Sequence, residues 1–341
     1  MVESNTRTPS RVDGGKICIF GDLHLSIAFN GQHISYGTEC YENMERIKEI
    51  CKEEKPSAII FLGDLIGVTE RNIRDRQFLM RVMQFFEYLN VVTEGKVYSV
   101  KGNHDIGDFS DYDFLVGMGL IKNPKYIDYY NDERGWEVRF HLVNYGHENE
   151  KLAITEATDA VSNVVLGHAD YYIDGVTNWY SAKGGVELSK LGNFCGVELV
   201  ISGHIHIPST EILYTTLKDG NSIGIFYTGS PSRVAERFDD CWYVTFEFNE
   251  TGTECNQKLM NLKPAKDVFY PKEQFDLDLV DDEEIMSKEK SEKLTLLVKD
   301  IIESRLTTGD IVSQIKSIPG FDDETKNLAT DYYQKAENGG K

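Results

Sequence analysis

The sequence lacks the features of several specialised protein classes. No apolar run approaches the ~18 residues that a membrane-spanning helix needs, so we expect no membrane association. Residues 1–15 (MVESNTRTPSRVDGG) contain no hydrophobic segment typical of a secretion signal, and we expect a disordered lead-in there. The six cysteines include no C-x-x-C pair, which argues against a zinc ribbon or a disulfide framework and favours a reducing, cytoplasmic location.

Positive charge is also scarce. The chain holds 36 lysines and arginines against 56 aspartates and glutamates, which gives a formal net charge of −20. A body this acidic is repelled by nucleic acid, so any role with DNA would need a local basic patch or bound metal cations. The acidic block 276–284 (DLDLVDDEE) accounts for part of the imbalance and is typical of a solvated segment.

Short apolar segments rich in β-branched residues recur along the chain and predict buried strands. They are KICIFGDLH from Lys16, SAIIFLGD from Ser57, KVYSVKGNHD from Lys96, SNVVLGH from Ser162 and VELVISGHIH from Val197. Residues 38–54 and 73–91 have the apolar spacing of amphipathic helices. The second half is richer in strand-like patterns, and Asp219-Gly220-Asn221 predicts a hairpin. We therefore expect an α/β fold in which two sheets pack together with helices outside.

Potential metal ligands follow each of the five apolar segments, and a glycine precedes every group. In chain order the ligands are Asp22 and His24, Asp64, Asn103 and His104, His168, and His204 and His206. Ligands bind beyond the carboxyl ends of strands in open α/β sheets. Each group alone is common without a metal, for example as a turn, but five in succession are very improbable by chance.

The residue types indicate which ions would bind. Carboxylate, amide and imidazole ligands without thiolates suit Mn²⁺, Fe²⁺ or Zn²⁺ at two adjacent positions and do not suit a closed structural zinc site. Two such ions, roughly 3.5–4 Å apart, share a bridging ligand and activate a water molecule. His204 and His206 are two residues apart, so on an extended strand their side chains point to the same side.

This set of motifs resembles the calcineurin-like metallophosphoesterases, whose pattern is D-x-H, G-D, G-N-H-[DE], H and G-H-x-H. The match runs from residue 16 to about residue 250 and includes every block. The resemblance implies a four-layer α-β-β-α sandwich that binds two divalent ions, with Mn²⁺ as the expected ion and Fe²⁺, Zn²⁺ or Mg²⁺ as alternatives.

The same resemblance implies a role for each residue of the pattern. Asp22, His24 and His206 would hold the first ion, Asn103, His168 and His204 the second, and Asp64 would bridge them. His104 would lie over the scissile phosphate, stabilise its developing charge and protonate the leaving oxygen as the catalytic acid. A hydroxide between the two ions would be the nucleophile. His33, His141 and His147 fall outside the pattern, and each is most simply a surface or packing residue. His33 lies on a loop after the first block and could alternatively contact substrate.

Three blocks resemble SbcD-like DNA exonuclease subunits more narrowly. They are GDLHLS from Gly21, GDLIG from Gly63 and FYTGSPSRVAERF from Phe226, and they imply that Ser230, Ser232 and Arg233 lie near a phosphate backbone. Two departures weigh against processive exonuclease action and against a full match. Ile66-Gly67-Val68 replaces an acidic or histidine residue of that family, and Thr228 replaces a proline.

A basic cluster after the Asp64 block offers a second substrate contact. Arg71, Arg74 and Arg76 could line a groove and accept DNA phosphates, although a solvated helix face with ion pairs explains them at least as simply. We predict a metal-dependent phosphodiesterase that acts on DNA. A phosphatase or phosphodiesterase acting on a small molecule or nucleotide, and a non-catalytic metal-binding scaffold, remain as alternatives.

The region after the catalytic motifs changes in character. We predict a lead-in at 1–15, a metallophosphoesterase domain at 16–262, and a linker with helices at 263–341. In SbcD-like proteins, the corresponding helices dock on a coiled-coil, SbcC-like ATPase subunit. Residues 286–305 and 313–336 could play that part, or they could pack on the domain or form a homodimer.

Overall fold

The computed structural model describes residues 8–26, 35–67, 76–106, 110–155, 161–174, 185–232, 240–250 and 252–263, with the backbone alone at 35–38 and 76. The chain divides into two compact units, Met1–Tyr270 and Pro271–Lys341. All described residues belong to the first unit. The predicted C-terminal helices lie outside the described residues, so the domain boundaries stay a prediction.

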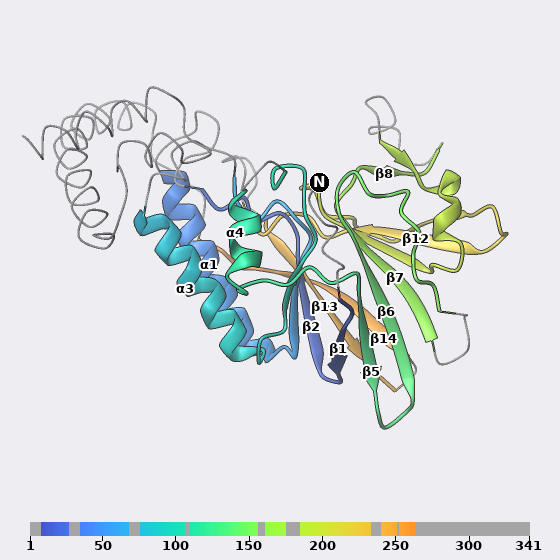
Figure 1. Ribbon diagram of the computed structural model, residues 1–341, viewed down its shortest axis with the longest axis horizontal. Helices are drawn as coiled ribbons and strands as arrows, with labels where there is room; N and C mark the ends of the chain where they lie inside the picture. Colours follow the sequence, from blue (N-terminus) through green and yellow to red (C-terminus); the bar gives the residue numbers. More distant parts are fainter. Residues whose placement is uncertain are drawn as a thin grey trace, which may run out of the picture. The chain divides into compact units, whose positions relative to one another are not determined.

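The first sheet has five strands in the order β14-β13-β2-β3-β4 (Figure 1). Their bounds are β2 Lys16–Phe20, β3 Ala58–Phe61, β4 Val97–Ser99, β13 Trp242–Phe248 and β14 Thr253–Leu259. Strands β2, β3 and β4 are parallel, and β13 is antiparallel to both of its neighbours. The carboxyl ends of the three parallel strands therefore meet at one edge of the sheet.

The second sheet has seven strands in the order β1-β5-β6-β7-β10-β12-β11. Their bounds are β1 Ser10–Asp13, β5 Tyr126–Asn131, β6 Trp136–Val143, β7 Val161–Gly167, β10 Leu199–Ser202, β11 Leu213–Thr216 and β12 Ser222–Tyr227. Strands β6, β7, β10 and β12 run parallel. The predicted hairpin is confirmed: β11 and β12 pair antiparallel around Asp219-Gly220-Asn221, where Gly220 has a φ of +86°.

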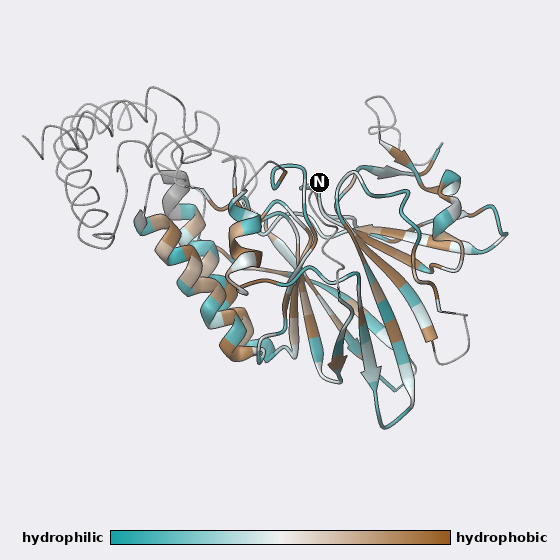
Figure 2. Ribbon diagram, in the orientation of Figure 1, coloured by the Kyte–Doolittle hydropathy of each residue, from teal (hydrophilic) through white to brown (hydrophobic). Residues whose placement is uncertain are grey.

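The two sheets pack face to face through a shared apolar core. Alternate residues of the first sheet (Ile17, Ile19, Ile60, Tyr98, Val244 and Phe246) meet those of the second (Tyr129, Phe140, Leu142, Leu166 and Ile201). The outer faces of both sheets are covered as well, so the strands are buried on both sides and read as nearly continuous apolar runs in the sequence. In Figure 2, brown apolar stretches occur on strands of both sheets, beside white and teal residues.

Helices cover the outer face of the five-stranded sheet. They are α1 (Ser35–Glu54), α3 (Arg76–Val92) and the short α4 (Asp111–Gly117) (Figure 1). Helix α3 buries Phe78, Val82, Phe85, Phe86 and Leu89 against this sheet, as its helical spacing predicts. The two helices predicted at 38–54 and 73–91 are thus confirmed; α1 begins three residues earlier, and residues 73–75 lie outside the described part.

The outer face of the seven-stranded sheet has a different cover. Among the described residues it packs against the 3-10 turns η1 (Leu188–Lys190) and η2 (Gly192–Phe194) and a small sheet of β8 (Tyr171–Tyr172) and β9 (Val186–Glu187). The mixed α/β fold is therefore confirmed. A helical fourth layer stays a prediction, since residues 156–160 and 175–184 lie outside the description. No helix in the described ranges is long and apolar enough to cross a membrane.

Candidate metal centre

The predicted ligands come together where the parallel strands of both sheets end. Asp22 and His24 follow β2, Asp64 follows β3, and Asn103 and His104 follow β4. His168 follows β7, and His204 and His206 follow β10. The inter-sheet core holds both edges side by side, so that ligand side chains from the two sheets meet.

The first group consists of Asp22, His24 and His206. The Nε2 atoms of His24 and His206 are 3.1 Å apart, and His206 Nε2 lies 3.9 Å from Asp22 Oδ1. The His24 and His206 rings meet edge to face, with centroids 4.9 Å apart. The ligand atoms of all three residues lie within 4.8 Å of one another, which is close enough for one ion.

The second group consists of Asn103, His168 and His204. Asn103 Oδ1 lies 2.9 Å from His168 Nε2 and 3.0 Å from His204 Nδ1. The two imidazole nitrogens, His168 Nε2 and His204 Nδ1, are 3.3 Å apart. Asp64, His168 and His204 also offer ligand atoms within 4.8 Å of one another.

Asp64 connects the two groups through a single carboxylate oxygen. Its Oδ2 lies 3.7 Å from His24 Nε2 in the first group and 3.3 Å from His168 Nε2 in the second. Its other oxygen, Oδ1, accepts a hydrogen bond from the backbone N–H of His104 (2.8 Å). This is the arrangement that a bridging carboxylate needs: one oxygen faces both groups and the other is held by the protein.

The atoms at the centre of each group fit a cation better than they fit one another. Two ligands about 2.1 Å from one ion and at right angles to each other lie about 3 Å apart, close to the separations found here. His168 Nδ1 donates a hydrogen bond to the carbonyl oxygen of Leu62 (2.6 Å), so in the neutral ring Nε2 carries a lone pair. That lone pair faces Asp64 Oδ2 and Asn103 Oδ1, which are both acceptors. Three acceptor atoms this close repel one another, and a cation bound between them would turn that repulsion into attraction.

Burial lowers the pKa of three imidazoles in the two groups, whereas the carboxylates raise that of the fourth, His168. It lowers the pKa of His24 to about 3 and the pKa values of His204 and His206 to about 4, which favours the neutral, ligating form. Burial also lowers the pKa of His168, but the charges of Asp22 and Asp64 outweigh it and raise that pKa to about 9. Without a metal, a proton on His168 thus supplies the positive charge that the two carboxylates favour.

The two carboxylates differ in their surroundings. Asp22 is fully buried, and this burial raises its pKa. Burial acts in the same direction on Asp64, but its hydrogen bond to His168 and the positive charge of His168 hold its pKa below the usual range. The backbone N–H of His204 lies 3.0 Å from both oxygens of Asp22 and fixes that carboxylate's orientation. Both carboxylates therefore stay close to imidazoles in a nearly dry site.

The backbone is strained at three of the ligands. His24, Asp64 and His204 have φ values of 44°, 48° and 72°, in the left-handed region that side chains rarely adopt. Close backbone approach also requires glycine: a Cβ on Gly102 would lie 2.1 Å from Asp64 Oδ1, and one on Gly63 would lie 2.6 Å from His168 Nδ1. Strain and crowding of this kind concentrate at functional sites.

His104 lies beside the first group. Its ring is half-buried and meets the His24 ring edge to face, with centroids 5.1 Å apart. The loop that carries it is held by the buried carboxylate of Asp105, which accepts from the N–H groups of Leu65 (3.2 Å) and Gly102 (2.9 Å). The protein therefore places this imidazole next to the predicted metal ligands without using it as a member of either group.

Two residues near the site were given no role by the sequence. Asp105, whose pKa is raised to about 7 by burial, is the acidic residue that ends the G-N-H-[DE] motif, but its hydrogen bond to Leu65 is a tertiary contact that the motif does not show. Tyr145 follows β6, and its ring centroid lies 5.9 Å from that of His204. No motif marks Tyr145, so its position follows only from the folded turn.

The predicted substrate contacts lie in several different environments. Ser230 is buried: its hydroxyl bonds to the carbonyl oxygens of Asp22 (2.7 Å) and Ser232 (2.8 Å) and accepts from the N–H of Ser232 (3.0 Å). The buried hydroxyl of Ser232 donates to the carbonyl oxygen of Leu23 and accepts from Asn43 Nδ2 (2.9 Å). Both serines therefore hold the Asp22 loop instead of presenting a hydroxyl to solvent.

The remaining predicted contacts lie outside the described residues or at their edge. Arg71, Arg74, Arg233 and His33 are outside, and Arg76 begins α3 with only its backbone described. The two other histidines behave as expected. His141 is buried on β6 with Nε2 3.1 Å from Asn163 Oδ1, and His147 is exposed and paired with Glu150 (2.6 Å).

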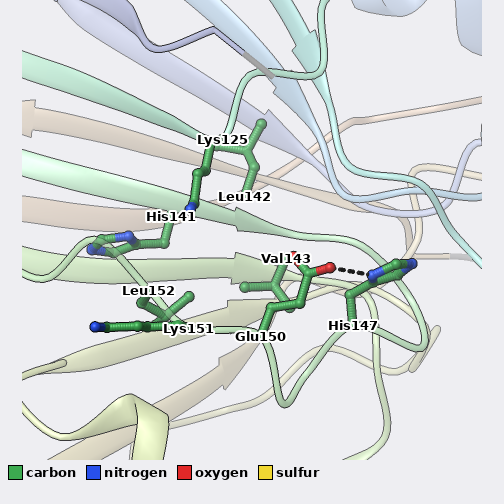
Figure 3. A pocket seen from close by; sticks show the side chains of 8 residues that line it. All are labelled: Lys125, His141, Leu142, Val143, His147, Glu150, Lys151 and Leu152. Atoms are coloured by element: carbon green, nitrogen blue, oxygen red, sulfur yellow. Dashed lines mark hydrogen bonds and ion pairs between the residues drawn. The ribbon is translucent and has the colours of Figure 1, made fainter. Parts of the chain in front are cut away.

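A small pocket lies on the outer side of β6, under the turn that follows this strand (Figure 3). Its lining residues are Lys125, His141, Leu142, Val143, His147, Glu150, Lys151 and Leu152. None of them belongs to the two ligand groups. The candidate functional site is therefore the histidine cluster and not this pocket.

Known proteins were compared with the chain in three ways. The calcineurin-like phosphoesterase family matches residues 15–208, which is more than half of the chain. No curated protein matches it. Similar solved structures include a 5'-nucleotidase precursor from Thermus thermophilus, 12% identical with a TM-score of 0.41, which aligns over 80% of this chain and 59% of its own. The present chain thus spans less than two thirds of that protein's length.

A second similar structure is the protein TT1561, also from Thermus thermophilus, 12% identical with a TM-score of 0.40, aligned over 71% of this chain and 98% of its own. The family match spans the strand ends that carry Asp22, Asp64, Asn103, His168 and His204. Members of this family use two divalent metal ions, and both groups of candidate ligands are present. From the motifs, the fold and this match together, the chain belongs to the calcineurin-like phosphoesterase family.

Proposed function

We propose that the chain is a two-metal phosphoester hydrolase whose substrates are phosphodiesters. The observation that carries the proposal is the position of Asp64 Oδ2, which faces a ligand nitrogen of each group (3.7 and 3.3 Å). Asp22, His24 and His206 would hold one ion, Asn103, His168 and His204 the other, and Asp64 both. When bound, two such ions polarise the phosphoryl group and activate water for attack.

The protein's own side chains would supply orientation and proton transfer. The hydrogen bond from His168 Nδ1 to Leu62 directs Nε2 into the centre, and the N–H of His204 orients Asp22. His104 is the proposed acid that protonates the leaving oxygen, because its imidazole lies beside the first group without belonging to it. Its backbone N–H, bonded to Asp64 Oδ1, links the acid to the bridging carboxylate.

The charge around the centre favours a phosphodiester, which is a monoanion, over a phosphomonoester. Lys101 precedes the Asn103 block, and its ammonium group is already paired with Asp113 (2.9 Å). The net charge of −20 adds a general repulsion that grows with the charge of the substrate. DNA is one phosphodiester of this class, and the narrower motif resemblance supports it; Arg71, Arg74, Arg76 and Arg233 would then contact its backbone.

The test compares three substrates with and without metal. Purified protein is incubated with bis(p-nitrophenyl) phosphate, p-nitrophenyl phosphate and labelled single- and double-stranded DNA, in Mn²⁺ and in EDTA. We expect Mn²⁺-dependent turnover of the bis-aryl diester above the monoester, and DNA cleavage if DNA is the natural substrate. Turnover that persists in EDTA, or that favours the monoester, contradicts the proposal.

A variant of His104 tests its role as the acid. We expect His104→Ala to lower kcat by about 10²–10⁴-fold while the metal content stays at the wild-type level, since an acid contributes this much. His147→Ala is the matched control, because the His147 side chain is exposed, pairs with Glu150 and belongs to neither ligand group. Full activity in His104→Ala would show that the acid has been assigned to the wrong residue.

A further inference from the structure

Tyr145 places an aromatic ring beside the second ligand group. Its ring centroid lies 5.9 Å from that of His204 and 6.2 Å from that of His168. The residue is 38% exposed, so it contacts these two imidazoles and remains accessible to solvent. Small-molecule sites are characteristically lined by aromatic side chains of this kind beside a few polar groups.

The backbone of Tyr145 is bonded to the segment that carries the Asn103 ligand. The N–H of Tyr145 donates to the carbonyl oxygen of Lys101 (2.8 Å), two residues before Asn103. The N–H of Lys101 in turn donates to Asn144 Oδ1 (2.9 Å). Two hydrogen bonds therefore join the turn that carries Tyr145 to the Asn103 loop, which preorganises the contact surface.

The rest of the turn is fixed as well. The N–H of Gly146, which has a φ of +80°, donates to Glu148 Oε1 (2.8 Å). Asn193 Nδ2 then ties the turn to η2 by donating to the carbonyl oxygens of Glu148 (2.8 Å) and Glu150 (2.7 Å). A turn with this many contacts keeps Tyr145 in position before a substrate arrives.

Tyr145 and His104 lie at different halves of the centre. The His104 ring contacts that of His24 in the first group, whereas the Tyr145 ring contacts His168 and His204 in the second. If His104 protonates the leaving oxygen, the leaving group lies on the side of the first group. The substituent that stays on phosphorus then lies toward Tyr145.

Two exposed apolar residues lie close in the sequence to the candidate ligands. Ile207, directly after His206, is 45% exposed, and Ile106, two residues after His104, is 57% exposed. Apolar and aromatic side chains suit a flat or apolar substituent better than a second phosphate group. Aromatic rings stack on flat groups in water, and each stacked base typically contributes about 1–3 kcal/mol.

We propose that Tyr145 determines specificity by stacking its ring on a flat aromatic group in the retained half of the phosphodiester. The substrate class is a diester whose retained alcohol carries such a group, as a nucleoside or an aryl alcohol does. This inference rests on the proposed function, because it uses His104 as the acid that defines the leaving side.

The experiment compares two diesters with the same leaving group. In bis(p-nitrophenyl) phosphate the retained substituent is an aryl ring, and in methyl p-nitrophenyl phosphate it is a methyl group. For Tyr145→Leu we expect kcat/KM on the bis-aryl diester to fall about tenfold, equal to ~1.4 kcal/mol, mainly through KM. The methyl ester is expected to change less than twofold, and Tyr145→Phe, which keeps the ring, to behave like the wild type on both.

Tyr214→Leu is the matched control, since Tyr214 is an exposed tyrosine (61%) on the edge strand β11. Metal content measured on every variant excludes loss of His168 or His204 as ligands. An equal loss on both diesters, or a loss in Tyr145→Phe as large as in Tyr145→Leu, overturns the stacking role.

A binding measurement without turnover distinguishes the inference about Tyr145 from the proposed function. With Mn²⁺ present, calorimetry is expected to show phenylphosphonate binding about tenfold more tightly than methylphosphonate in the wild type and equally in Tyr145→Leu. If no diester is hydrolysed but this preference holds, the proposed function fails and the aromatic contact of Tyr145 stands. If turnover occurs without any aryl preference in rate or binding, the inference about Tyr145 fails alone.

Discussion

The buried hydroxyl of Ser230 allows a quantitative test of how the Asp22 loop is held. The hydroxyl has one proton, so at any moment it donates to only one of the carbonyl oxygens of Asp22 and Ser232, while it also accepts from the N–H of Ser232. Ser230→Ala therefore removes two hydrogen bonds at once. At about 1 kcal/mol for each net bond, the free energy of unfolding should fall by about 2 kcal/mol.

The same change should loosen Asp22, whose carbonyl oxygen loses its partner. Residues that orient metal ligands typically contribute about 10–100-fold in metal affinity or activity, so we expect a loss in that range for Ser230→Ala. The KM for substrate should change little, because the hydroxyl is buried and does not face the solvent.

The assays are denaturant unfolding, a calorimetric titration with Mn²⁺, and steady-state kinetics on bis(p-nitrophenyl) phosphate. Ser162→Ala is the control, because its hydroxyl pairs with Glu198 at the surface and its loss should cost less than about 0.5 kcal/mol. A Ser230→Ala protein with normal stability, normal metal affinity and a raised KM would refute this reasoning. That result would instead support the contact with a phosphate backbone that the sequence motif implied.

Two further predictions test the crowding at Gly102 and the lowered pKa of His141. Gly102→Ala should lower the free energy of unfolding by ~1–3 kcal/mol and weaken metal binding, since its Cβ would lie 2.1 Å from Asp64 Oδ1. Gly117→Ala, which meets nothing within 4 Å, is the control and should cost nothing in the same unfolding and titration experiments. Burial lowers the pKa of His141 to about 4, whereas in the unfolded chain it is about 6.5. Between these pH values the unfolded chain therefore binds a proton that the folded chain does not bind. Stability should therefore fall by about 3 kcal/mol as the pH drops from 6.5 to 4, and the difference between wild type and His141→Gln, both saturated with metal, isolates this term from the other histidines. A pH-independent difference between the two proteins would show that His141 does not titrate in this way.

Much of the candidate site could be predicted because its information is local. Each ligand directly follows a short apolar strand, so the chain itself places Asp64 after β3 and His204 after β10. The rule that parallel strands end at a common edge then predicted that these side chains gather. The predicted helices and the hairpin at Gly220 followed from equally local signals.

Other parts of the site depend on contacts that no local pattern encodes. The motif placed Ser230 near a phosphate, but the fold turns its hydroxyl toward the Asp22 carbonyl. Tyr145 lies in an ordinary turn, and its ring lies near His204 because hydrogen bonds join that turn to Lys101, more than forty residues away in the sequence. The cover over the outer face of the seven-stranded sheet depends on how η1 and η2 pack, which the periodicity of the strands does not specify.

The central claim is that two cations bind where the strands end, with Asp64 between them. The most direct measurement is an anomalous difference map at the manganese edge from crystals grown with Mn²⁺. We expect two peaks about 3.5–4 Å apart, one among Asp22, His24 and His206 and one among Asn103, His168 and His204, with Asp64 Oδ2 in contact with both. A single peak, or peaks only at surface carboxylates away from these histidines, would contradict the account.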